Sequence, residues 1–152
     1  MSTVYIGIGS NLGSREDNCR AAIRHLVDNG IKVLKLSSMI ETEPWGVREQ
    51  PKFINMAIEA ETGLDPEELL RLLKKIEADI GRRPTVHWGP RLIDLDILLY
   101  DDLVLKTPDL EIPHPGIADR YFVLRPLADI AAEIIHPVLN KSIKSLLSEI
   151  SA

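Results

Sequence analysis

The chain has 152 residues, of which 45% are hydrophobic and 27% charged, and its formal net charge is −5. These values predict one globular domain over residues 1–152, and the acidic balance argues against nonspecific binding to nucleic acid. The single cysteine excludes an intramolecular disulfide, and the chain has neither a signal-like start nor an apolar stretch long enough to cross a bilayer. We therefore expect a cytoplasmic monomer that does not bind membranes.

The first half of the chain predicts three strands and one helix. Residues 3–9 (TVYIGIG) place β-branched residues at alternate positions, which is typical of a buried strand. Ser14 is a candidate N-cap for a helix whose apolar residues recur at helical spacing until Gly30. Residues 31–39 and 53–61 then predict the second and third strands.

The second half predicts two clear helices and one strand. Asp65 and Glu68 form a capping-box pattern at the start of a helix that ends at Gly81. Residues 92–100 (LIDLDILLY) predict the fourth strand, and a short segment lies near 117–132. The final helix is predicted from the apolar residues on one of its faces, Ile143, Leu146, Leu147 and Ile150.

The order of these elements is β-α-β-β-α-β followed by a C-terminal helical extension. This is the ferredoxin-like pattern, an α+β fold with an antiparallel sheet and both main helices on one face. In that order the first strand lies between the third and fourth. The opposite face of the sheet is then left for loops, a partner or a ligand.

Two aspartates in the fourth strand indicate a candidate metal site. Because side chains alternate along a strand, Asp94 and Asp96 share one face about 6.6 Å apart. The apolar residues of the strand should then share the helix-covered face: Ile93, Leu95, Ile97 and Leu99. Two carboxylates on a rigid strand suit magnesium that also holds phosphate oxygens. The alternative is a pair of solvated acids on the polar side of an amphipathic strand.

Three arginines precede this pair. Arg82, Arg83 and Arg91 lie within ten residues that contain no acid, and guanidinium groups bind phosphate with a fork of donors. Arginines beside metal-binding acids form the electrostatic pattern of phosphoryl transfer. The loop between them carries Trp88, and we interpret it as a lid over ATP. A solvated basic loop is the alternative.

A second set of residues predicts a site for a flat heterocycle. Trp45 stands between Pro44 and Gly46 in the loop 41–52, where it offers an aromatic wall. Asn55 interrupts an otherwise apolar strand, and its amide can donate and accept toward a heterocycle. It can equally be an amide satisfied by the backbone. Gly7 and Gly9 fall on one face of the first strand and leave room beside Asn55 and the aspartates, if that face is the open one.

These features together resemble the 6-hydroxymethyl-7,8-dihydropterin pyrophosphokinase family over almost the whole chain. The matching segments are YIGIGSNLG, TEPWG, QPKFINMA, EADIGR, WGPRLIDLDIL and IPHPGIADRYFVLRPLADIA. The resemblance implies a diphosphotransferase of folate synthesis that moves pyrophosphate from ATP to the dihydropterin and releases AMP. It also implies two magnesium ions bridged by Asp94 and Asp96, with Arg82 and Arg91 as further catalytic residues.

The resemblance assigns other residues to the two substrates. Positions around ATP are Lys74, Glu77, Arg82, Arg91, His114 and Arg120. Positions around the pterin are Thr42, Pro44, Trp45, Phe53, Asn55, Trp88 and Phe122, with Phe122 and a residue of the first loop on either side of the ring.

Two other classes of function fit the same fold. An RNA-binding domain would need stacked aromatic residues on the central strands and a basic face, but the first strand offers Tyr5 alone and the chain is acidic. A regulatory module that binds a ligand without turnover is the second. An assay for AMP with and without a dihydropterin distinguishes it from an enzyme.

Overall fold

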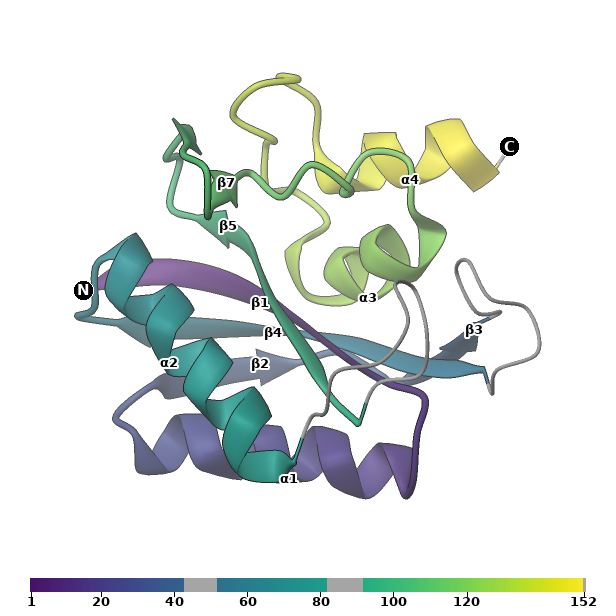
Figure 1. Cartoon of the computed structure of the whole chain (residues 1–152). Helices are drawn as coiled ribbons and strands as arrows, with labels where there is room; N and C mark the ends of the chain where they lie inside the picture. Colours follow the sequence, from purple (N-terminus) through teal and green to yellow (C-terminus); the bar gives the residue numbers. More distant parts are fainter. Residues whose placement is uncertain (43–51, 82–91, 152) are drawn as a thin grey trace.

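A computed structural model describes residues 1–42, 52–81 and 92–151, and shows a central antiparallel sheet (Figure 1). Its strands are β1 (Ser2–Ser10), β2 (Lys32–Leu36), β3 (Ile40–Thr42), β4 (Phe53–Thr62) and β5 (Asp94–Tyr100). The strand order is β2-β4-β1-β5, and β3 pairs with β4 beyond the end of β2. The expected position of the first strand, between the third and fourth predicted strands, is therefore confirmed.

Helices α1 (Arg15–Asp28) and α2 (Pro66–Ile80) cover one face of the sheet, as predicted (Figure 1). The capping box of α2 is present: Asp65 accepts from the Glu68 N–H, and Glu68 accepts from the Asp65 N–H. Helix α1 begins after Ser14, but the Ser14 hydroxyl makes no capping hydrogen bond. The larger core lies between these helices and the sheet, and it contains Ile6, Ile8, Leu26, Ile58, Leu69, Leu73, Ile76 and Leu95.

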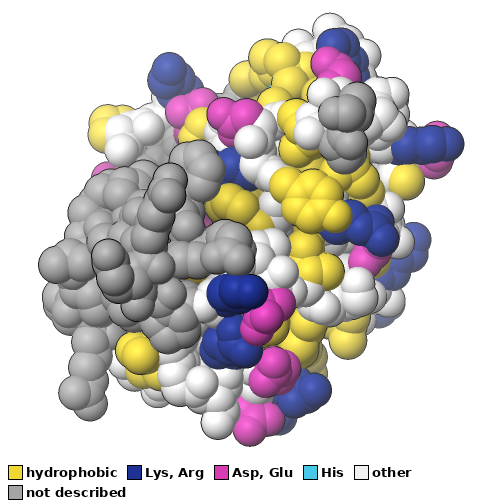
Figure 2. All heavy atoms as spheres, turned by 90° about the vertical axis from the view of Figure 1, so that its right-hand side faces the viewer, with side chains coloured by type: hydrophobic (Ala, Val, Ile, Leu, Met, Phe, Trp, Pro, Cys, Tyr) yellow, Lys and Arg dark blue, Asp and Glu magenta, His cyan; other side chains and the backbone are white. Residues whose placement is uncertain are grey.

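The other face of the sheet is covered at one end by α3 (Tyr121–Ala131) and α4 (Ile143–Ser151). A second core joins them to the sheet through Tyr5, Ala57, Leu98, Leu99, Leu124, Leu127, Ile143 and Leu146. The expectation that this face is left open is therefore wrong for that part. Figure 2 views the molecule from the right-hand side of Figure 1 and shows hydrophobic side chains gathered on that face.

Two strand predictions need correction. Within the predicted strand 31–39, only Lys32–Leu36 form a strand (β2), and the separate strand β3 begins at Ile40. Directly after β2, the Ser37 hydroxyl accepts the Ala57 N–H at 2.8 Å. The register of β1 against β5 shifts between Tyr5 and Ile6, so that Leu99 pairs with Tyr5 while Ile97 pairs with Ile6. Leu99 consequently lies in the second core, on the face opposite Ile97. A bulge of this kind reverses the alternation of side chains.

The remaining strands, β6 (Leu105–Lys106) and β7 (Glu111–Ile112), form a small hairpin after β5. The chain then passes through residues 113–116 to α3. None of the helices in the described ranges combines the length and apolar character that a membrane span requires.

Candidate active site

Asp94 and Asp96 lie at the start of β5, on the face opposite the larger core. Ile93, Leu95 and Ile97 are buried in that core, whereas the Asp96 side chain is 56% exposed. Asp94 pairs with Gly9 of β1, and Asp96 pairs with Gly7. The predicted orientation of the two carboxylates is therefore confirmed.

The donor set of these two residues fits magnesium. Among the described residues, no group of three or more His, Cys, Asp or Glu side chains could hold a metal ion by itself. Magnesium does not need such a cage, since it is commonly bound by one or two carboxylates together with water and substrate phosphates. Asp94 and Asp96 supply hard oxygen ligands on a rigid strand.

His114 faces the same carboxylates from the segment after β7. Its Nδ1 accepts the Gly116 N–H at 3.0 Å, so the neutral ring carries its proton on Nε2. Nε2 lies 3.9 Å from Asp96 Oδ1. Burial lowers the pKa of His114 below 6.5, and Arg120 lowers it further, while Asp96 and Glu111 act in the opposite direction. His114 is therefore a neutral donor beside Asp96 at neutral pH.

Arg120 reaches this site across Gly116. A β-carbon at Gly116 would lie 2.9 Å from the Cδ, Nε and Cζ atoms of Arg120. The arginine precedes the first residue of α3, and its charge acts on His114. The absence of a side chain at Gly116 thus allows the guanidinium to lie against the turn that carries His114.

The candidate pterin residues of the described part come from β3, β4 and α3. Asn55 Nδ2 donates to Thr42 Oγ1 at 2.9 Å, and Thr42 pairs with Phe53 across the two strands. Asn55 also pairs with Gly9 of β1. The half-buried Phe122 is the second residue of α3.

The ATP candidates of α2 have a different environment. Glu77 is only 4% exposed, and its Oε2 accepts the Leu95 N–H at 2.8 Å. Lys74 Nζ lies 3.7 Å from Glu77 Oε1. The Glu77 carboxylate is therefore directed at the backbone of β5, between the two aspartates along the chain.

Several candidate residues lie outside the described ranges. They are Pro44, Trp45, Arg82, Arg83, Trp88 and Arg91. The loop interpreted as a lid, between Arg82 and Arg91, is also outside the described ranges. Arg15 joins the two described flanks of residues 43–51: its guanidinium donates to the Lys52 carbonyl at 2.7 Å and lies 2.9 Å from Glu41.

The structure adds polar residues that sequence reasoning did not single out. Ser10 and Asn11 follow Gly9 and are fully buried. Asn18 Nδ2 donates to Ser10 Oγ at 3.2 Å and to the Leu12 carbonyl at 2.9 Å, which fixes the turn between β1 and α1. The sequence could have indicated them, because they are two consecutive polar residues directly after the predicted strand 3–9. Gly116 gave no comparable signal.

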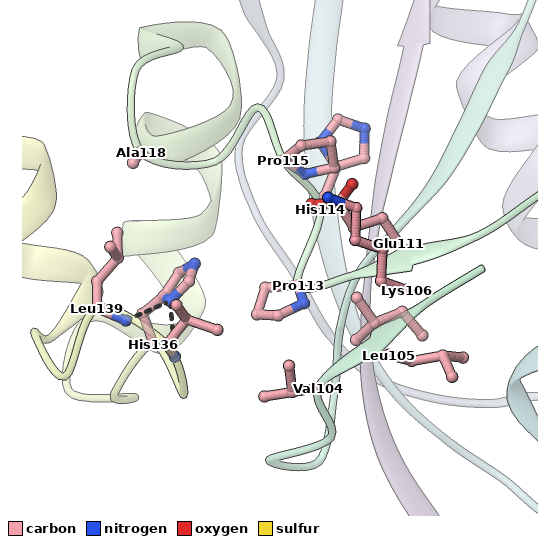
Figure 3. A pocket seen from close by; sticks show the side chains of 12 residues that line it. Val104, Leu105, Lys106, Glu111, Pro113, His114, Pro115, Ala118, His136 and Leu139 are labelled. Carbon is pink, nitrogen blue, oxygen red and sulfur yellow. Dashed lines mark hydrogen bonds between the residues drawn. The ribbon is translucent and has the colours of Figure 1, made fainter. Parts of the chain in front are cut away.

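A cavity of about 260 Å³ lies behind His114, between the β6–β7 hairpin and the connection from α3 to α4 (Figure 3). Its walls are mainly apolar. On the far side, His136 Nδ1 accepts the N–H groups of Val138 and Leu139. The His136 ring therefore fixes the turn formed by the residues that follow it.

Comparison with known proteins places this geometry in a family. Residues 5–132 match the family described as 7,8-dihydro-6-hydroxymethylpterin-pyrophosphokinase. The chain is 42% identical to the 2-amino-4-hydroxy-6-hydroxymethyldihydropteridine pyrophosphokinase of Aquifex aeolicus, over 98% of this chain and 92% of that protein. It is 46% identical to the enzyme of the same name from Bacillus subtilis, over 86% of this chain and 78% of that protein.

The family match and these relatives define a diphosphotransferase, an enzyme that moves a pyrophosphate group. The chain belongs to the 7,8-dihydro-6-hydroxymethylpterin-pyrophosphokinase family. It also covers about a fifth of a longer relative, the folic acid synthesis protein fol1 of Pneumocystis carinii, with 44% identity.

Solved structures show the same fold at low sequence identity. The HPPK-DHPS protein of Plasmodium falciparum superposes with a TM-score of 0.80 at 18% identity. The match covers 97% of this chain and 42% of that one.

Proposed function

We propose that Asp94, Asp96 and Asn55 form the centre at which this chain carries out its reaction. The chain is a pyrophosphokinase of folate synthesis, with ATP and 6-hydroxymethyl-7,8-dihydropterin as its substrates. Its family is generally magnesium-dependent. We assign the metal and the triphosphate to the β5 side of the site and the pterin to the β4 side.

One observation carries this assignment. Gly9 of β1 pairs with Asn55 on one side and with Asp94 on the other. Directly paired residues of an antiparallel sheet point to the same face. Asn55 and Asp94 therefore share a face and are separated by a strand that bears only a hydrogen atom at that position. The arrangement places an amide and a carboxylate on the same side of the sheet, with one strand between them.

The reaction requires alignment and charge neutralisation. The hydroxymethyl oxygen of the pterin forms a bond to the β-phosphorus of ATP and loses its proton. The bond between that phosphorus and the oxygen bridging to the α-phosphorus breaks, and AMP leaves with this oxygen. Magnesium supplies positive charge to the phosphate oxygens when bound. The transfer then depends on how accurately the side chains hold the two substrates in line.

We assign the side chains of the site to the metal, to ATP and to the pterin. Asp94 and Asp96 would hold the metal, and we assign two ions to them. His114 offers a neutral Nε2–H donor beside Asp96. Arg120 offers a permanent positive charge near His114. Asn55 and Thr42 would orient the pterin edge. We keep the remaining assignments as part of the same proposal, with Lys74, Glu77, Arg82 and Arg91 on ATP and Pro44, Trp45, Phe53, Trp88 and Phe122 around the pterin.

The reaction is tested with the purified chain, ATP, magnesium and 6-hydroxymethyl-7,8-dihydropterin. AMP and the pterin diphosphate should form in equal amounts. The matched control is 6-methyl-7,8-dihydropterin, which lacks the attacking hydroxyl and should yield no AMP. Formation of ADP, or binding of both ligands without AMP, would contradict the proposed reaction.

We also propose that residues 1–152 act as one domain, as a cytoplasmic monomer without nucleic acid or membrane partners. Both cores share the central sheet, which supports one folding unit. The net charge of −5 supports the absence of a nucleic-acid partner. Sedimentation of the chain with and without substrates measures its oligomeric state.

A further inference from the structure

Gly9 occupies the position where the two halves of the site meet. It is buried in the central strand β1, with Asn55 on one neighbouring strand and Asp94 on the other. Gly9 does not have a positive φ, in contrast to Gly13, Gly30 and Gly81. Its backbone conformation therefore does not require glycine, and another property of the site must account for it.

The position of the Asn55 amide explains why residue 9 is a glycine. A β-carbon at Gly9 would lie 2.8 Å from Asn55 Oδ1, closer than real β-carbons approach another heavy atom. The opposite end of the amide donates to Thr42 Oγ1 at 2.9 Å. Asn55 is thus held between the Thr42 hydroxyl on β3 and the bare Cα of Gly9 on β1. Any side chain at position 9 must displace the amide oxygen.

We propose that Gly9 is a positioning residue that determines recognition of the pterin, because its lack of a side chain allows the Asn55 amide to adopt its binding orientation. This inference rests on the proposed function of Asn55. Gly9 acts through Asn55. The amide oxygen lies over β1, on the side of the aspartates, while the amino group is directed to β3.

The experiment replaces Gly9 by alanine and measures the affinity for each substrate separately by calorimetry. Gly9→Ala should weaken pterin binding by about 10- to 100-fold, the loss expected when an amide that contacts the bound ligand no longer meets its partners. Affinity for an unreactive ATP analogue should not change. Gly63→Ala is the control, since Gly63 is exposed after the end of β4 and the nearest atom to a β-carbon there is Met1 Sδ, at an ordinary contact distance of 3.7 Å. Gly63→Ala should keep the wild-type pterin affinity.

A double variant distinguishes the contact between a β-carbon at position 9 and the Asn55 amide from a general destabilisation of β1. In an Asn55→Ala background, Gly9→Ala should cause no further loss of pterin affinity, since the displaced group is absent. If Gly9→Ala alone folds poorly because of the collision, Asn55→Ala should restore its melting temperature. An equally unstable double variant, or an equal loss of affinity for both substrates, would overturn the inference.

Asn55→Ala alone distinguishes this inference from the proposed site. If Asn55→Ala binds the pterin as tightly as the wild type, the assignment of Asn55 itself fails. If Asn55→Ala loses pterin affinity while Gly9→Ala does not, the site stands and only the role of Gly9 is refuted.

Discussion

Replacing Glu77 tests what holds the metal-binding strand in place. Glu77 is almost fully buried, and its carboxylate takes the N–H of Leu95, the residue between the two aspartates. Glu77→Ala leaves this buried N–H without its acceptor, which costs about 1–3 kcal/mol. For a chain of this size, that loss lowers the melting temperature by roughly 2–12 °C. Turnover should fall as well, because the start of β5 carries Asp94 and Asp96.

Glu77→Gln separates this role from direct contact with ATP. The glutamine oxygen can still accept the Leu95 N–H, so most of the stability and the activity should return. Asp79→Ala, an exposed substitution on the same helix, is the control and should change the stability by less than about 0.5 kcal/mol. Thermal melting and nucleotide titration measure both quantities. If Glu77→Gln keeps the stability but loses ATP affinity as fully as Glu77→Ala, the carboxylate binds ATP directly, and the loss of turnover does not arise from the position of β5.

Two other predictions follow from the geometry. Gly116→Ala places a β-carbon 2.9 Å from the Arg120 side chain and should displace it. ATP binding should then weaken by about 10-fold, the size of one lost charged contact. An unchanged ATP affinity in a titration would show that Arg120 is not needed at this position. Burial lowers the pKa of His136 below its usual 6.5, so the unfolded chain binds a proton more readily and stability should fall as the pH drops below about 6.5. His136→Asn keeps an acceptor for the N–H groups of Val138 and Leu139, and its melting temperature should vary less between about pH 7.5 and pH 5 than that of the wild type.

The sequence was most informative where one local rule acts alone. Alternation identified β1 and β4, and the pattern from Asp65 to Glu68 located the start of α2 together with its capping box. The same alternation placed Asp94 and Asp96 on the face away from the larger core. These features depend on neighbours along the chain, so they can be recognised without knowledge of the fold.

The sequence was less informative where distant segments meet. Leu99 was assigned to the wrong face because the bulge opposite β1 depends on how two strands pair. The contact of Glu77 with the Leu95 backbone, and the fit of Arg120 over Gly116, join segments that no periodic pattern relates. The cover that α3 and α4 form over the second face was missed because their apolar residues fit any partner surface equally well.

The most direct test of the central claim is the single-turnover rate of Asp96→Ala, measured as AMP release with saturating magnesium and both substrates. The side chain is exposed and faces away from the larger core, so the variant should keep its fold and its melting temperature. The rate should fall by at least about 100-fold, as for the loss of one strong electrostatic contact in a transition state. Asp102→Ala, another exposed aspartate, should retain the wild-type rate. AMP release by Asp96→Ala at the wild-type rate would contradict the assignment of the metal site to β5.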